Sequence, residues 1–442
     1  MRQKWLKLKR INGGLQRYWK LSVVSCLVLG EAIASSGNYA WGQIASDNTL
    51  GSENSFVTSP IPGAFLIEGG ATRGTNLFHS FSEFSVPTFG IAYFNNADEI
   101  QNILSRVTGA SISNIDGLIA ANGTANLFLL NPNGIIFGSN AALNIGGSFV
   151  GSTASSLNFG DGTQFSATSS QTTPLLTVSV PFGLQYGGNA GSIQVQNSTL
   201  QVPNGETLAL VGGNVQLNGA SLQAEGGRVE LGGVAGSGTV ALNLDDNNLR
   251  LSFPDGVALA DVSLSNAASV DASGKGGGNI QVQGNRITLT DESGITADTE
   301  GNENGGRILL QASQVIVRDG SFVLAGTFST GQGGNLTVNA SDSVEVSGTT
   351  LDGEDSSILG TDTYGAGAAG NVDINTQQLI VRDGGLVSSI TQEQGAGGNL
   401  TVNASDSVQV SEGDLNTTTY DAGAAGNLTI NTGRLIIHDG AV

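Results

Sequence analysis

Few residues in this 442-residue chain carry side chains that catalyse reactions, and those few are scattered. The sequence has one cysteine, Cys26, and two histidines, His79 and His438. His79 is the sole imidazole base in the first half, but it lies in the phenylalanine-rich stretch NLFHSFSEF, where a histidine is more often structural than catalytic. The sequence therefore predicts no catalytic centre built on a nucleophile and a histidine base.

The acidic residues are equally poor candidates for chemistry. Asp245, Asp246 and Asp255 could be proposed as acid and base of a polysaccharide lyase or hydrolase, which also needs basic groups to neutralise a uronate. After residue 42 there is one lysine, Lys275, in the glycine-rich stretch GKGGGN. No zinc spacing, EF-hand or calcium-binding nonapeptide repeat occurs. We therefore expect no catalytic residues, no metal and no cofactor, and a protein that is not an enzyme.

Residues 1–42 have the organisation of a secretory signal peptide. Seven of the 17 basic residues lie within the first 20, and the apolar run Leu21–Ala34 follows, interrupted by Glu31. We expect cleavage after Gly42. An uncleaved anchor is the alternative, but the run is short for a membrane span. A lipoprotein box ending at Cys26 is a second alternative, but the apolar run continues past that cysteine.

Cleavage there changes the charge and the redox chemistry of the chain. It removes seven of 17 basic and one of 37 acidic residues, leaving 10 and 36, a net charge of −26. Such an acidic protein is not expected to bind nucleic acid or to insert directly into a membrane. Because the only cysteine is removed as well, the exported chain has no disulfide framework.

Short repeats dominate the second half of the chain. The decapeptide NLTVNASDSV occurs unchanged at residues 335–344 and 399–408, and related units begin at 279, 307, 371 and 427. Each unit holds two short alternating strands and a glycine-bearing turn, and buries only a thin row of Val, Leu and Ile. Such units are stable only when stacked, which predicts an all-β fold, a parallel β-helix. A propeller would need four strands per repeat.

One asparagine recurs at a fixed register of these units. Glycosylation is one interpretation, since NLT is an acceptor pattern. Stacking at one corner of successive turns, with amides hydrogen-bonded along the stack, better explains the fixed register. This structural ladder is predicted at Asn279, Asn335, Asn371, Asn399 and Asn427.

The composition changes near residue 185. Thirteen of the 16 phenylalanines lie between Phe56 and Phe182, which indicates a separate and larger core before the repeats. We therefore divide the chain into a signal peptide (1–42), an N-terminal domain (43–185) and glycine-rich β-helix repeats (186–442). One helix is predicted over Asn96–Val107, with Asn96 as its cap and Ile100, Ile103, Leu104 and Val107 on one face.

Three stretches of the N-terminal domain resemble a known family. The residues GGATRGTNLFHSFSEF (69–84), ILSRVTGASISNIDGLIAANGTANLFLLNPNGIIFG (103–138) and the following GGSFVGSTAS are similar to the filamentous haemagglutinin N-terminal domain, the two-partner secretion domain of large exported adhesins. The resemblance covers roughly residues 47–182. The glycine-rich repeats and the lead-in SDNTLG look most like cyanobacterial members.

The resemblance implies both a fold and a partner. In that family the domain caps a right-handed β-helix and is recognised by periplasmic domains of an outer-membrane β-barrel transporter, which threads the exoprotein out without ATP. The family's NPNGI motif corresponds to Asn131, Pro132, Asn133, Gly134 and Ile135, a secretion or turn motif. Its residue types suit a tight turn, so a purely fold-stabilising role is at least as well supported as partner contact.

The family's earlier Asn-Pro-Asn-Leu motif is absent, and FNNADEI (94–100) occupies its place. We expect a secreted or cell-surface, adhesin-like exoprotein that passes through the periplasm of a Gram-negative-type cell. A host or surface glycan or protein is a further candidate partner. The alternatives are a surface-layer or matrix structural protein and a carbohydrate-active β-helix enzyme. Earlier repeats continue past the point where RLIIHDGAV ends, so the chain could be a fragment of a longer protein.

Overall fold

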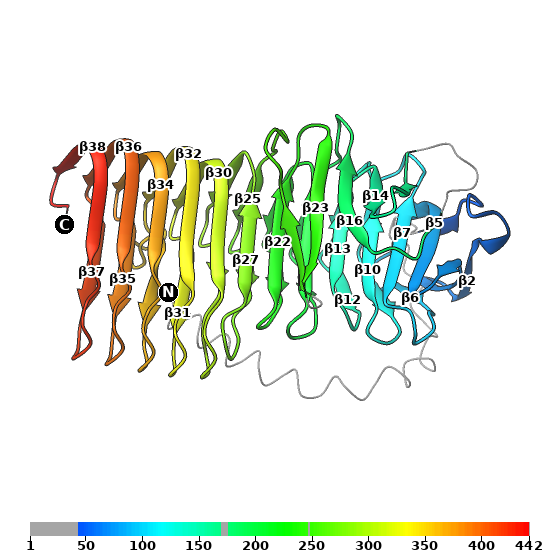
Figure 1. The fold of residues 1–442 in the computed structure, drawn as a ribbon, viewed down its shortest axis with the longest axis horizontal. Helices are drawn as coiled ribbons and strands as arrows, with labels where there is room; N and C mark the ends of the chain where they lie inside the picture. The colour runs from blue at the N-terminus through cyan, green and yellow to red at the C-terminus, as the bar shows by residue number, and fades with distance from the viewer. Residues whose placement is uncertain (1–42, 169–175, 246–247, 442) are drawn as a thin grey trace.

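The computed structural model describes residues 43–168, 176–245 and 248–441, which form an elongated rod of β-strands (Figure 1). Within these residues the one helical element is the short 3-10 helix η3 (Gly51–Glu53). No helix in the described part of the chain has the length and apolarity needed to cross a membrane. The predicted signal peptide, residues 1–42, lies outside the described residues.

Two faces of the rod belong to one 20-stranded sheet. Its first face is a column of parallel strands, each bonded to the strand one turn earlier: β5 (Asn76–Phe84), β7 (Asn102–Val107), β10 (Asn126–Leu130), β13 (Phe149–Ser152), β19 (Thr207–Gly212), β22 (Arg228–Gly233), β27 (Asn279–Gln283), β30 (Arg307–Arg318), β32 (Asn335–Ser347), β34 (Val372–Arg382), β36 (Leu400–Ser411) and β38 (Leu428–His438). The second face stacks β8 (Ser113–Ile115), β11 (Ile135–Phe137), β17 (Ile193–Gln196), β20 (Val215–Asn218), β25 (Val262–Ser265) and β28 (Arg286–Leu289). From β30 onward, one long strand contributes to both columns.

The third face consists of two smaller sheets. The N-terminal one contains β2 (Ser55–Ile61), β3 (Ala64–Gly69), β6 (Ile91–Phe94), β9 (Leu118–Ala121) and β12 (Ala142–Asn144). The second contains β18 (Thr199–Gln201), β21 (Ser221–Gln223), β26 (Ser269–Asp271), β29 (Gly294–Thr296), β31 (Phe322–Thr327), β33 (Ile358–Thr363), β35 (Leu386–Thr391) and β37 (Asp414–Thr419). At the N-terminal end, β1 (Ile44–Ser46) and β4 (Ala71–Arg73) pair antiparallel with β5 as a cap. The predicted capped, right-handed parallel β-helix is confirmed.

The interior of the rod is a set of in-register apolar stacks. Successive strands pair in parallel, and from β30 onward their register shifts lie between the two columns, as between Ala312 and Gln314, so the same inward position recurs within each column. One row of paired residues in the first-face strands shows this continuity: Leu77, Ile103, Leu127, Phe149, Leu208, Val229, Ile280, Ile308, Leu336, Val372, Leu400 and Leu428. Each stacked side chain fills space above its predecessor, so one continuous core runs through the rod.

The helix predicted over Asn96–Val107 is wrong, since residues 102–107 form strand β7, buried at every position. Ile103 points into the rod and Leu104 packs on its outer side, so the segment is apolar on both faces. Burial on both faces abolishes strand alternation and leaves spacings that mimic a helix. Asn96, the predicted cap, instead accepts a hydrogen bond from the Asn122 backbone nitrogen at 3.0 Å.

An antiparallel sheet outside the rod covers part of the first face. Its strands are β14 (Ser156–Phe159), β15 (Gln164–Ser166), β16 (Pro181–Tyr186), β23 (Gly238–Asp245) and β24 (Asn248–Ser252). A second apolar core lies between this sheet and outward residues of the rod such as Phe78, Leu104 and Phe128. The sheet therefore joins segments on both sides of residue 185 into one folded layer.

The row of outward-facing residues on the first face is apolar at its N-terminal end and contains polar residues farther along the rod. Phe78, Leu104, Phe128, Val150 and Ala209 are followed in the same row by Glu230, Gln281, Leu309 and Thr337. Glu230 is fully buried, and Arg228 Nη1 donates to its Oε1 at 3.0 Å. Burial raises the pKa of Glu230 to about 7, although the Arg228 charge opposes the shift. This carboxyl group therefore costs stability when it ionises.

The Glu230→Gln variant tests how much folding stability is lost when this buried carboxyl group ionises. A raised acid pKa means that the folded state binds the proton more tightly, so stability present below the ordinary value of 4.5 is lost as pH rises through about 7. We expect wild-type stability to fall by up to about 3 kcal/mol over this window, and the variant to lack the fall. Thermal unfolding followed by circular dichroism from pH 4.5 to 8 measures it. The exposed Glu225→Gln is the control, and identical pH profiles for Glu230→Gln and wild type would contradict the assignment.

Candidate functional site

The NPNGI motif forms a tight turn between β10 and β11. The Gly134 nitrogen donates to the Asn131 carbonyl oxygen at 3.1 Å, which closes the turn. The Asn133 nitrogen donates to Asn131 Oδ1 at 3.0 Å, so the first asparagine also caps the turn with its side chain. Gly134 has φ of +130°, a conformation that other residues rarely adopt. Pro132 supplies the fixed φ of the second position.

The same turn is bonded to the turns of the helix before and after it. On one side, Asn131 Nδ2 donates to the Ser111 carbonyl oxygen and to Ser113 Oγ, both at 2.9 Å. On the other side, the Gly191 nitrogen donates to the Pro132 carbonyl oxygen at 2.9 Å. Asn131, Gly134 and Ile135 are buried, and Asn133 is the one exposed member. Most of the motif is therefore buried within the protein.

Four of the five predicted ladder asparagines lie in one hydrogen-bonded column. The backbone nitrogens of Asn371, Asn399 and Asn427 each donate to the side-chain oxygen of the asparagine one turn earlier, at 2.8–2.9 Å, and the column begins at Asn335. Asn279 occupies the same register two turns before Asn335. Its Oδ1 accepts from the backbone nitrogen of Arg307 at 3.2 Å, because arginine replaces asparagine in the next turn.

Two further groups of stacked asparagines were not predicted from the sequence. The first group runs parallel to the predicted ladder, with Nδ2 to Oδ1 distances of 2.8–2.9 Å, and contains Asn339, Asn375, Asn403 and Asn431. The second occupies the same register as the predicted ladder near the N-terminus and contains Asn76, Asn102 and Asn126. The sequence carried a signal in both cases: a second asparagine four residues into the unit, and an asparagine that begins each of the tripeptides NLF, NIL and NLF.

Two buried polar groups near the N-terminus are structural. His79 lies 2.9 Å from Ser55 Oγ through Nδ1 and stacks on Phe81, and burial lowers its pKa to about 3, which keeps the ring neutral. Arg106 is also fully buried, with Nε donating to Ser80 Oγ at 2.8 Å and its guanidinium 4.4 Å from the Phe165 ring centroid. Burial lowers its pKa to about 10 against the opposing charge of Asp47.

Asp47 anchors the first described residues to this network. Its carboxylate accepts from Ser80 Oγ at 2.7 Å and from Thr108 Oγ1 at 2.5 Å. Burial alone would raise the pKa of Asp47, but hydrogen bonds from Thr108, Thr49 and Ser80 outweigh it and lower the pKa. Such a network holds β1 and η3 against β5 and β7.

The other residues considered for chemistry do not converge. Asp255 is exposed between β24 and β25, Lys275 is exposed between β26 and β27, and Asp246 lies outside the described residues. His438 ends β38 beside Asp439. Across the described ranges, no three His, Cys, Asp or Glu side chains are grouped so that they could hold a metal ion.

Comparison with known proteins agrees with this geometry. The family model of the TPS secretion domain matches residues 42–282, more than half of the chain. The crystal structure of the HMW1 secretion domain from Haemophilus influenzae is similar with a TM-score of 0.53 at 16% identity, covering 88% of this chain and 100% of that one. At this identity the likeness concerns the fold alone. No curated protein matches the chain.

The buried position of Asn131 leads to a test of the turn. Asn131→Ala leaves Ser113 Oγ and the Asn133 nitrogen without their partner, and we expect a loss of about 2–4 kcal/mol in unfolding free energy. Asn133→Ala is the matched control and should cost about 1 kcal/mol or less, since this side chain is exposed. Thermal and denaturant unfolding compare the two. Equal losses would contradict the view that the motif acts mainly through its buried first residue.

Proposed function

Because the chain belongs to the family of two-partner secretion (TPS) domain proteins, we propose that it is an exoprotein exported through a partner outer-membrane β-barrel, with an adhesin-like role at the cell surface. The single observation that carries the export function is the family match over residues 42–282, which spans the cap, the NPNGI turn and the antiparallel sheet. We assign a removable signal to residues 1–42, partner recognition to 43–185 and surface display to 186–442.

The architecture suits passage through a pore as an extended chain. Each strand of the rod bonds to the strand one turn before it, so an emerging segment needs only the preceding turn as its template. No cysteine follows residue 26, so folding outside the cell requires no oxidant. We propose that the cap folds first and that each later turn adds to the exposed edge of the previous one. The free energy of folding would then oppose backward movement of the chain.

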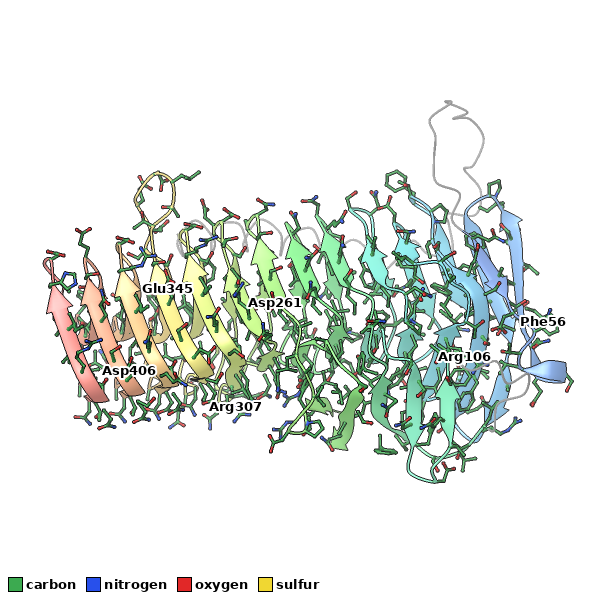
Figure 2. The ribbon with its side chains drawn as sticks, turned by 90° about the horizontal axis from the view of Figure 1, so that it is seen from above. Phe56, Arg106, Asp261, Arg307, Glu345 and Asp406 are labelled. Atoms are coloured by element: carbon green, nitrogen blue, oxygen red, sulfur yellow. The ribbon has the colours of Figure 1, made fainter. Side chains whose placement is uncertain are left out.

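One hairpin favours a binding role over a purely structural one. The repeat starting at Asn335 is eight residues longer than its 28-residue neighbours, and a Thr349–Ser356 bridge closes a hairpin in that repeat. The Thr350 nitrogen donates to the Asp355 carbonyl oxygen at 2.8 Å, and Leu351 at the tip is fully exposed at 107%. This hairpin projects from the rod near the strand that carries Glu345 (Figure 2). Insertions on one face of a repeat protein often form its binding site.

Export is tested by expressing the chain in a Gram-negative host with and without its cognate barrel. We expect release into the medium only with the barrel. Gly134→Val should reduce release, because φ there is +130° and a Cβ would lie 3.0 Å from the Ser192 carbonyl oxygen. Immunoblots of medium and periplasm measure release, and Val180→Thr, at an exposed site, is the control. Release without the barrel, or periplasmic retention of the wild type with it, would refute the proposal.

The adhesin-like role is tested on the hairpin. Leu351→Ser and removal of the eight inserted residues should each lower attachment of cells displaying the protein several-fold, with secretion and melting temperature unchanged. Tyr420→Ser, at a site 69% exposed, is the control. Unchanged attachment would contradict a binding role for the hairpin. Ordered assembly on the cell surface would instead favour the surface-layer or matrix protein, and glycan turnover by purified protein the enzyme.

A further inference from the structure

The edge strand of the antiparallel sheet that covers the first face rests on the rod without a neighbouring strand. Among the described strands, β24 pairs with β23 alone. On its other edge, two side chains of the rod bond to the backbone of Leu251 in place of a strand. Gln281 Nε2 donates to the Leu251 carbonyl oxygen at 3.3 Å, and the Glu230 carboxyl group accepts the Leu251 N–H. Glu230 and Gln281 are paired positions on the adjacent strands β22 and β27, so together they form one polar attachment for β24.

The same strand also buries apolar side chains against the rod. Leu249 and Leu251 are each 1% exposed and belong to the second apolar core, together with Val211 of the rod. The ring of Phe253, directly after the strand, lies over Gly232, where a Cβ would come within 2.4 Å of it. Lifting β24 from the rod would therefore expose apolar side chains to water.

The polar attachment is incompletely hydrogen-bonded. Glu230 has no exposed area, and its Oε1 accepts from Arg228 Nη1 at 3.0 Å. Its Oε2 and the Nε of Arg228 are buried without a hydrogen-bond partner in the described structure. A buried carboxyl oxygen that lacks a donor is an unfavourable place for negative charge. The arrangement with β24 on the rod therefore suits a protonated Glu230.

Two positive charges face Glu230, and the strands on either side of β22 add no ionisable group. Arg228 lies two residues before Glu230 on β22, and Arg250 lies on β24. Strands β19 and β27 carry no ionisable side chain. Both arginines favour the ionised form, but burial outweighs them and raises the pKa of Glu230 to about 7. Because the ordinary pKa is 4.5 and returns when water reaches the carboxyl group, ionisation favours a lifted β24.

We propose that β24 is a pH-controlled latch, which lies on the rod while Glu230 is protonated and lifts locally when Glu230 ionises. The lifted latch uncovers Leu249, Leu251 and the rod surface beneath them. The stacked turns stay folded, because the strand pairing that joins them does not involve β24. The closed latch is favoured most below pH 4.5 and progressively less as pH rises to about 7. This inference concerns the folded chain and is independent of the export function.

Hydrogen–deuterium exchange of the intact protein, read by mass spectrometry, tests the latch. Exchange of the amides of residues 249–253 is compared at pH 5 and pH 8, after correction for the pH dependence of the intrinsic exchange rate. We expect the opening equilibrium of this segment to rise by about a hundredfold in the wild type, as a pKa difference between 4.5 and about 7 requires over this range. Glu230→Gln should remove the rise, because its side chain stays neutral at both pH values.

A second variant moves the equilibrium in the opposite direction. Arg250 is exposed, so Arg250→Gln should leave the fold unchanged. It removes a charge that favours ionised Glu230 on the rod, so the rise in opening should exceed that of the wild type. Glu225→Gln, at an exposed site, is the control and should match the wild type.

The contrary outcomes are distinct. The amides of β36 report on a part of the rod that can open without β24, and their opening should not change with pH. If it rises together with that of residues 249–253, Glu230 acts on global stability and the latch is wrong. Unchanged opening of residues 249–253 in the wild type, or an equal rise in Glu230→Gln, would also overturn it. If Glu230→Gln does not fold, a rise in Arg250→Gln no larger than that of the wild type overturns the proposal.

Discussion

In-register parallel stacking is the constraint on which the rest of this structure depends. Each turn of the helix lies directly on the one before. Where the backbones of neighbouring turns come closest, a side chain would collide with the backbone of the neighbouring turn. At Gly370, Gly398 and Gly426 a Cβ would lie 1.8–1.9 Å from the carbonyl oxygen of the glycine one turn earlier. These glycines immediately precede the ladder asparagines at 371, 399 and 427. The glycine content and the fixed register of the asparagines therefore have one cause.

The glycines allow the backbones of neighbouring turns to come close, and the asparagines supply hydrogen bonds between those turns. Close backbone approach at the corners leaves peptide groups between strands, and an amide side chain supplies both a donor and an acceptor to the turns above and below. Where arginine replaces asparagine, as at Arg307, the preceding Asn279 still accepts the backbone bond. The ladder is thus a chain of backbone and side-chain bonds that tolerates local substitution. The NPNGI turn follows the same logic, since Asn131 bonds one neighbouring turn and Pro132 and Ile135 the other.

The sequence made the repeats and the helix class predictable because inward positions alternate with polar ones over most of the rod. It failed where a strand is buried on both sides, as at Ile103 and Leu104, because alternation disappears there. The covering sheet was missed because β14, β16 and β23 are distant in sequence and carry no repeat. In the sequence, only apolar residues at outward positions, such as Phe128 and Val150, indicated that a second sheet covers this face.

The bonds that join successive turns run along the rod, so the molecule has a characteristic mechanical response. A pull applied along the axis of a surface-bound rod would load the terminal turn first and detach it before the next. Each 28-residue turn would release on the order of 90–100 Å of extended chain. Shear on such a protein would then be absorbed as a series of discrete extensions, and slack chain could rewind on the template that remains.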